Sequence, residues 1–165
     1  MNGLISRGLR PLLLVLSILL SACASPPAKP PAVGAGAHWQ GRLAVKVFST
    51  PVQAFSADFD LQGSPTAGEL TLISPLGASL ARMQWTPTTA TLNAQGQART
   101  FDSIQELARQ ITGADLPVTS LFAWLEGRNE AAEGWQVDLQ ELAQGRIQAH
   151  HVEAVKADLK IILDR

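Results

Sequence analysis

Apolar and polar side chains alternate along most of this chain, and that alternation constrains the fold more than any other feature. The first run begins at Trp39, where apolar residues or glycine take every second position and polar residues such as Arg42 stand between them. Further runs follow at 55–61, 69–72, 81–85, 91–93, 135–140 and 159–164, and 146–152 is another short strand candidate. Successive strand residues point to opposite faces, so a period of two predicts strands with one buried and one solvated face. With turn residues at Gly63, Pro87 and Gly96, the pattern predicts a curved antiparallel sheet of about eight strands.

Between the fifth and sixth runs the period becomes helical. Ser103 and Glu106, three residues apart, form a capping box, and Gly113 is placed to end the helix. The apolar stripe of this helix consists of Ile104, Leu107, Ala108 and Ile111. A second helix is predicted from Pro117 to Gly127, and it is apolar on nearly every side. Such a helix must lie against the sheet or inside its curve, so the fold class is α+β, with the sheet wrapping two mid-chain helices.

The N-terminal residues have the order of an export signal. Arg7 and Arg10 precede an apolar run at 12–20, which is shorter than the roughly 20 residues that a membrane span requires. The tetrapeptide 20–23, Leu-Ser-Ala-Cys, resembles the bacterial lipobox, although an ordinary signal peptide with a chance cysteine is the alternative. We therefore expect a signal peptide at 1–22, lipid on Cys23, a tether rich in Pro, Ala and Gly at 23–37, and a folded domain at 38–165.

Composition limits the partners. Removing residues 1–22 leaves 165 − 22 = 143 residues, enough for one domain, with a formal charge of 11 − 14 = −3. This mild acidity argues against nucleic acid as a partner and against a basic patch that binds anionic lipid. No aspartate follows Cys23, and in Gram-negative lipoproteins an aspartate there favours the inner membrane. The expected location is therefore the outer membrane.

Motifs of catalysis are missing from the sequence. His150 and His151 are neighbours on a predicted strand and point to opposite faces, so they do not chelate a metal together. Neither a nucleophile elbow nor a phosphate-binding loop is present. Four carboxylates are interpreted as a solvated rim, and the alternative is that two of them form a catalytic pair. They are Glu130, Glu133, Asp138 and Glu141. We expect no enzyme activity, no cofactor and no metal.

One predicted turn has an unusual tip. Residues 72–78, Leu-Ile-Ser-Pro-Leu-Gly-Ala, join two strands and place Leu76 where turns usually carry polar residues. Its side chain either folds back onto the core or projects outward. In a protein tethered to a membrane, an exposed leucine would indicate shallow insertion into lipid.

Several phrases together resemble the LolB family of outer-membrane lipoprotein receptors. They are WQGRLAV at 39–45, FSADF at 55–59, the turn at 74–77, LFAWLEG at 121–127 and the closing residues 159–165. The resemblance implies an incomplete antiparallel β-barrel, or curved sheet, with helices covering an apolar cavity. It also implies a monomer that is not an enzyme, is lipid-anchored in the inner leaflet and faces the periplasm. Such a protein accepts acylated lipoproteins from the carrier LolA and places them among outer-membrane phospholipids.

The resemblance also suggests site residues. Pro75, Leu76 and Gly77 match the family's membrane insertion loop. Candidates for the acyl-chain cavity are the inward apolar residues, namely Leu43, Val45, Phe55, Phe59, Leu72, Met83, Trp85, Leu121, Trp124, Trp135, Ile161 and Leu163. Plain core packing is the alternative for each of them. The segment from Trp135 to the end has room for about three strands, which leaves closure of the barrel open. A structural lipoprotein that scaffolds an envelope complex, and more distantly a lipid-modifying enzyme, are the rival functions.

Overall fold

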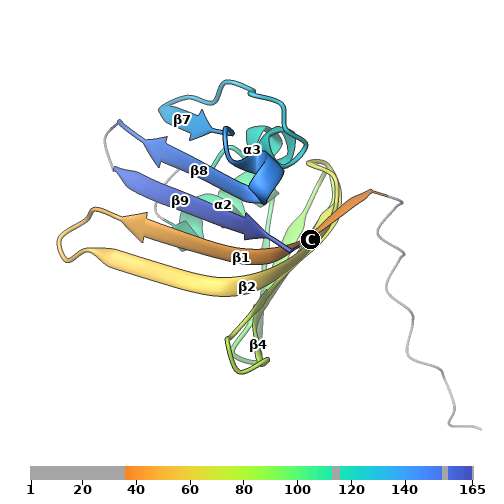
Figure 1. Cartoon of the computed structure of the whole chain (residues 1–165). Coiled ribbons are helices and arrows are strands. Elements are labelled where there is room, and N and C mark those ends of the chain that lie inside the picture. The colour runs from red at the N-terminus through yellow and green to blue at the C-terminus, as the bar shows by residue number, and fades with distance from the viewer. Residues whose placement is uncertain (1–35, 113–115, 154–155, 165) are drawn as a thin grey trace, which may run out of the picture. The chain divides into compact units, whose positions relative to one another are not determined.

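The computed structural model describes residues 36–112, 116–153 and 156–164, all within one compact unit, Val33–Arg165 (Figure 1). The predicted signal peptide, Cys23 and nearly all of the tether lie outside the described residues. Ala37, the last residue assigned to the tether, is already the first residue of a strand. No helix in the described ranges is long and apolar enough to cross a membrane.

The described residues form a single antiparallel sheet. Its strands are β1 (Ala37–Val47), β2 (Gln53–Gly63), β3 (Gly68–Ile73), β4 (Ser79–Trp85), β5 (Ala90–Ala94), β6 (Gln97–Phe101), β7 (Trp135–Asp138), β8 (Arg146–His151) and β9 (Ala157–Leu163). The strand order is β6-β5-β4-β3-β2-β1-β9-β8-β7, so β6 and β7 are the edges. These edges do not pair with each other, and the sheet is therefore curved and open instead of being closed into a barrel.

The predicted strands are present, and β6 is an additional strand that the alternation did not predict. Every residue of β6 except the half-buried Phe101 is exposed, so its sequence has no clear apolar face. It pairs with β5 across a two-residue turn in which Gln95 and Gly96 both have positive φ, at 53° and 75°. Positive φ at both central positions is the type I′ geometry that matches the twist of a hairpin. The tight turn, not a buried face, therefore positions this strand.

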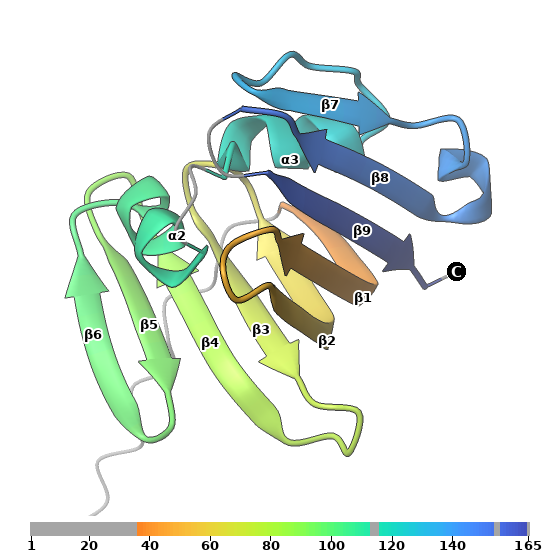
Figure 2. The same ribbon diagram turned by 90° about the vertical axis from the view of Figure 1, so that its left-hand side faces the viewer.

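Two helices lie on the concave side of the sheet (Figure 2). Helix α2 (Ile104–Thr112) begins as predicted, because the Glu106 N–H donates to Ser103 Oγ at 3.1 Å. Its predicted end at Gly113 lies outside the described residues. Helix α3 (Val118–Leu125) follows Pro117, and six of its eight side chains are buried, which confirms the prediction that it lies deep in the fold. A short 3-10 helix, η1 (Leu142–Gln144), connects β7 to β8.

Antiparallel pairing gives the sheet two distinct ends. The connections 48–52 (β1 to β2), 74–78 (β3 to β4) and 95–96 (β5 to β6) lie at the same end as Val152, which follows β8. We call this the open end. The first residues of β1 and the connections 64–67 (β2 to β3) and 86–89 (β4 to β5) lie at the other end, which we call the sealed end.

Candidate functional site

A pocket of about 180 Å³ lies between the concave face and the two helices, and every side chain that lines it is apolar. Eleven of the twelve predicted cavity residues line it: Leu43, Val45, Phe55, Phe59, Leu72, Met83, Trp85, Leu121, Trp124, Trp135 and Ile161. Leu163 does not. It pairs with Gly41 near the start of β1, and its N–H donates to the Gly145 carbonyl at 2.7 Å, so it lies beyond the pocket.

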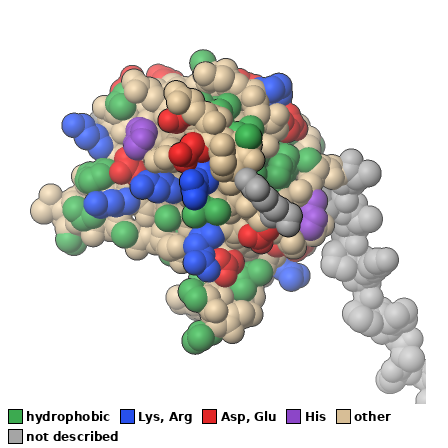
Figure 3. All heavy atoms as spheres, viewed as in Figure 1, with side chains coloured by type: hydrophobic (Ala, Val, Ile, Leu, Met, Phe, Trp, Pro, Cys, Tyr) green, Lys and Arg blue, Asp and Glu red, His purple; other side chains and the backbone are tan. Residues whose placement is uncertain are grey.

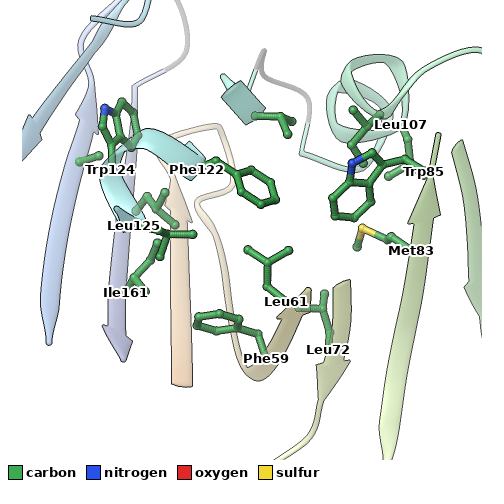
Figure 4. Close-up of a cluster of buried hydrophobic side chains, with 14 of the residues drawn as sticks. Phe59, Leu61, Leu72, Met83, Trp85, Leu107, Phe122, Trp124, Leu125 and Ile161 are labelled. Atoms are coloured by element: carbon green, nitrogen blue, oxygen red, sulfur yellow. The ribbon is translucent and has the colours of Figure 1, made fainter. Parts of the chain in front are cut away.

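Sequence reasoning left out twelve further lining residues. They are Leu61, Leu70, Ile104, Leu107, Ala108, Ile111, Leu116, Pro117, Val118, Phe122, Leu125 and Leu159. The strand residues among them belong to the same alternating runs, and those in α2 belong to its apolar stripe, so the signal was present in the sequence. Figure 4 shows Leu61, Phe122 and Trp85 converging on this space from β2, α3 and β4.

Aromatic rings close the pocket toward the sealed end. Phe122 meets Trp39 edge to face, with 5.6 Å between ring centroids, and meets Trp85 in the same way at 6.3 Å. The indole N–H of Trp85 donates to the Ser64 carbonyl at 3.0 Å, so its polar atom is satisfied outside the pocket. A Cβ at Gly68 would lie 2.4 Å from the Trp85 ring, so only glycine lets this ring take its position.

Helix α3 is fixed over the pocket by similar contacts. The indole N–H of Trp124 donates to the Glu130 carbonyl at 2.8 Å, and the buried Ser120 hydroxyl donates to the Ala131 carbonyl at 3.3 Å. The rings of Trp124 and Trp135 lie 6.3 Å apart. No buried side-chain polar atom in the described ranges lacks a hydrogen-bond partner. The polar atoms of the wall are therefore paired away from the pocket, and its interior offers only apolar contacts.

Toward the open end the pocket continues into a groove of about 640 Å³. The two spaces share Val45, Phe55, Leu72, Met83 and Ile111. The groove adds four polar side chains, those of Gln53, Gln95, Arg99 and Gln110. Phe55 is 44% exposed and belongs to both spaces, so it stands where the pocket opens into the groove.

Arg99 is the unusual residue of the groove. In the β5–β6 register it stands opposite Leu92, which is buried on the concave face, so the Arg99 side chain belongs to that same inner face. Five of the six arginines in the described ranges form ion pairs, whereas Arg99 forms none. The groove therefore holds an unpaired cation beside apolar surface.

The β3–β4 connection projects from the open end, below β4 in Figure 1. Ser74 organises it: its carbonyl accepts from the Gly77 N–H at 2.8 Å and its hydroxyl from the Ala78 N–H at 3.1 Å. Gly77 has φ of 83°, a conformation that favours glycine. Leu76, at the tip, is 96% exposed. Of the two conformations that the sequence left open, the structure has the outward one.

The titratable side chains lie apart from the pocket. His150 Nδ1 lies 2.8 Å from Asp158 Oδ1 on the outer face, while the His151 ring packs 5.2 Å from that of Trp135. Glu130 and Glu141 each form an ion pair with an arginine. In the described ranges, no three His, Cys, Asp or Glu side chains are grouped so as to hold a metal ion.

A polar cluster occupies the outer face at the sealed end. Asp60 accepts hydrogen bonds from Gln40 at 2.7 Å and Gln62 at 3.1 Å, and lies 3.1 Å from His38. Partial burial opposes ionisation of Asp60, but these hydrogen bonds outweigh it and hold the pKa of the carboxyl below its ordinary value. This cluster stabilises the fold and does not face the pocket.

An open sheet with an apolar pocket and a projecting leucine is thus formed by the segments that carried the resemblance. The sequence profile of the family described as "Outer membrane lipoprotein LolB" matches residues 37–162. The chain belongs to the LolB family. The profile covers the whole described sheet apart from its last residue, Leu163, so the match concerns the pocket and the projecting loop together.

Individual LolB proteins agree with this assignment. The protein from Chromobacterium violaceum is 33% identical over 124 residues, which are 72% of this chain and 67% of the relative. The protein from Bordetella petrii is 35% identical over 137 residues, 79% of this chain and 67% of the relative. The protein from Shewanella loihica is 32% identical over 94 residues, 57% of this chain and 42% of the relative. All three are named outer-membrane lipoprotein LolB, which supports the predicted location and disfavours the scaffold alternative.

Proposed function

We propose that this protein is a lipoprotein receptor of the outer membrane. It accepts lipoproteins from a LolA-like periplasmic carrier, holds their acyl chains in the pocket and groove, and places them in the inner leaflet of the outer membrane. The observation that carries this proposal is a pocket with an entirely apolar lining that opens toward the exposed Leu76, in a member of the LolB family.

The physical need for such a pocket follows from the cost of exposing hydrocarbon. Each buried methylene is worth about 0.8 kcal/mol, so an acyl chain of about fifteen would cost on the order of 12 kcal/mol to carry through water. The pocket alone, at about 180 Å³, is smaller than the roughly 300–1,000 Å³ of typical ligand sites. The acyl chains therefore need the adjoining groove as well, and the eleven predicted cavity residues that line the pocket serve as their apolar contacts.

The polar side chains of the groove suit the other part of the cargo. A lipid-modified cysteine carries ester and amide carbonyls next to its acyl chains, and these groups accept hydrogen bonds. Arg99, Gln95 and Gln110 supply donors along the groove. With the tails in the pocket, the carbonyls would lie in the groove and the polypeptide would leave at the open end.

Leu76, flanked by Pro75 and Gly77, is the proposed insertion point into lipid. Lipid on Cys23, after removal of residues 1–22, would hold the monomeric protein in the inner leaflet through the tether at 23–37. The direction of transfer would come from differential affinity, with cargo bound more tightly here than on the carrier and more favourably still in the membrane.

The test follows a radiolabelled lipoprotein from the loaded carrier to this protein and then to phospholipid vesicles. We predict that Leu76→Glu leaves uptake from the carrier near normal and lowers delivery to vesicles at least tenfold, because a carboxylate resists entry into lipid. Ile162→Glu is the matched control, since Ile162 is 51% exposed on the outer face of β9 and should change neither step.

Equal loss of uptake and delivery in Leu76→Glu would contradict the assignment of Leu76 to the membrane step. Failure of the unmodified protein to take any label from the carrier would instead remove the receptor function and favour a structural lipoprotein.

A further inference from the structure

Exposed apolar side chains concentrate at the open end of the sheet. Eight large hydrophobic residues in the described ranges are exposed, and Ile162 on the outer face is the exception to the pattern. Six of the other seven lie on or beside the open-end connections, namely Phe48, Val52, Phe55, Leu76, Leu80 and Val152, and the seventh, Ile111 of α2, lines the groove that opens there. Leu76 is therefore one member of a larger apolar surface that surrounds the groove.

The β1–β2 connection makes the second projection of this surface. Phe48 is 46% exposed and Val52 is 55% exposed, yet the Phe48 N–H donates to the Lys156 carbonyl at 2.9 Å, so the connection is held against the start of β9. Lys46 Nζ lies 4.8 Å from the centre of the Phe48 ring. The exposed side chains are thus presented on a hydrogen-bonded loop that lies beside the Lys46 ammonium group and the Lys156 backbone.

The two projections stand on either side of the groove. Val47 and Gln53 line it from beside the β1–β2 connection, and Leu80 and Ala81 line it from beside the β3–β4 connection. Figure 3 shows hydrophobic side chains at both projecting tips, over the β1–β2 connection and over the β3–β4 connection. The groove mouth therefore opens between them.

We propose that the β1–β2 connection is a second lipid contact, so that the bilayer touches the open end at two places and covers the groove mouth between them. This inference rests on the proposed function of the groove. Separate projecting tips suit a bilayer, whereas a stable protein partner needs about 800 Å² of continuous surface on each side. Lys46, with its ammonium group over the Phe48 ring, places a positive charge beside the apolar tip, which suits the phosphates of lipid headgroups. An acyl chain would then pass from groove to bilayer without crossing water.

The chain before β1 is long enough for this orientation. Cys23 and Ala37 are 37 − 23 = 14 residues apart, which spans about 50 Å at full extension. Ala37 lies at the sealed end, and the eleven residues of β1 put it about 33 Å from the open end. A lipid on Cys23 therefore permits the open end to face the same membrane, but with little length to spare.

The first experiment measures lipid contact directly on the full, lipidated protein in vesicles of phosphatidylethanolamine and phosphatidylglycerol. Because Cys23 is the only cysteine, Val52→Cys, Leu76→Cys and Ile162→Cys each give one site for an environment-sensitive fluorophore. We expect the labels at 52 and 76 to be shielded from an aqueous quencher and quenched by a lipid-borne one, and the label at 162 to behave in the opposite way.

A label at 52 that is as water-accessible as the label at 162, while the label at 76 lies in lipid, would overturn the second contact and leave the proposed function intact. Water exposure of both loop labels would overturn the second contact and, in addition, the membrane step assigned to Leu76. Transfer of cargo from the carrier is measured separately and is unaffected by either result.

The second experiment shortens the chain before β1. Deleting residues 25–32 leaves six residue intervals and a reach of about 20 Å, less than the length of β1. We expect the label at 52 to lose its lipid contact and delivery to fall at least tenfold. Replacing residues 25–32 by eight Gly and Ser residues is the control and should retain both. An unchanged lipid signal at 52 in the shortened protein would refute the proposed orientation.

Discussion

The two ends of the sheet are built from the same strands, but one exposes polar connections to solvent and the other exposes apolar side chains. At the sealed end the connections are polar and bonded to themselves: Ser64 Oγ lies 3.1 Å from Thr66 Oγ1, and Thr86 Oγ1 lies 3.0 Å from Thr89 Oγ1. At the open end, Leu76 stands 96% exposed on a loop of similar length. Turn tips normally carry polar residues because they face water. Folding therefore does not require apolar tips, since the connections at the sealed end join their strands with polar residues.

The difference extends into the interior. Phe122, Trp85 and Trp39 pack edge to face and close the pocket toward the sealed end, whereas Phe55 is only half covered where the pocket meets the groove. Stability should therefore depend mainly on residues near the sealed end, and lipid handling mainly on residues near the open end.

The largest effect should come from a substitution that tests this division directly. Phe122→Ala removes a ring that is 2% exposed and packed between two tryptophans, so we expect a loss of about 4 kcal/mol in the free energy of unfolding and a fall of about 10 °C or more in Tm. Leu76→Ala should change that free energy by less than about 0.5 kcal/mol. Guanidinium unfolding followed by tryptophan fluorescence measures the free energy of unfolding of both variants, and thermal unfolding measures Tm. Similar losses in the two variants would show that the ends are not energetically distinct.

A smaller effect is expected where pocket and groove meet. Phe55→Glu places a carboxylate beside the path of the acyl chains, and we expect uptake of labelled lipoprotein to fall at least tenfold, which corresponds to about 1.4 kcal/mol. Phe55 is 44% exposed, so the fold should tolerate the change. Phe55→Leu is the control that keeps the surface apolar and should retain uptake. Normal uptake by Phe55→Glu would mean that acyl chains do not pass this residue.

The smallest effect concerns Asp60 at the sealed end. Because the folded state lowers its pKa, the carboxylate contributes stability at pH values above about 4, and this contribution disappears as the pH falls further and the unfolded state binds the extra proton. The amount should be under about 1 kcal/mol. Urea unfolding of the unmodified protein and of Asp60→Asn, compared at pH 7 and pH 3, isolates it. A difference between the two proteins that is the same at both pH values would contradict this account.

Most of the fold could be predicted from the sequence because one face of each long strand is buried and leaves a clear period of two. The two helices could also be predicted, α2 from the capping box at Ser103 and α3 from its apolar sequence. Strand β6 was missed because its position depends on a turn of only two residues, Gln95 and Gly96, and not on a buried face.

The site could be predicted in part, for a related reason. Alternation in the sequence identifies the inward apolar residues, and eleven of the twelve predicted residues line the pocket. Leu163 follows the same alternation but lies past the pocket, because alternation gives the face of a residue and not its distance along the sheet. The position of Arg99 in the groove could not be predicted, since its place opposite Leu92 depends on the β5–β6 register. The gathering of Phe48, Val52 and Leu76 likewise depends on which connections share an end.

In the part of the chain that the structure describes, the edge strands β6 and β7 do not pair with each other, and this has a consequence for the range of cargo. In a closed barrel, strand number and stagger fix the diameter. A sheet whose two edge strands are not joined can change its curvature while every strand keeps its hydrogen-bonded neighbours, so we expect the space under α2 and α3 to be adjustable. We therefore expect such a receptor to accommodate anchors with different numbers and lengths of fatty acids without any rearrangement of its backbone pairing.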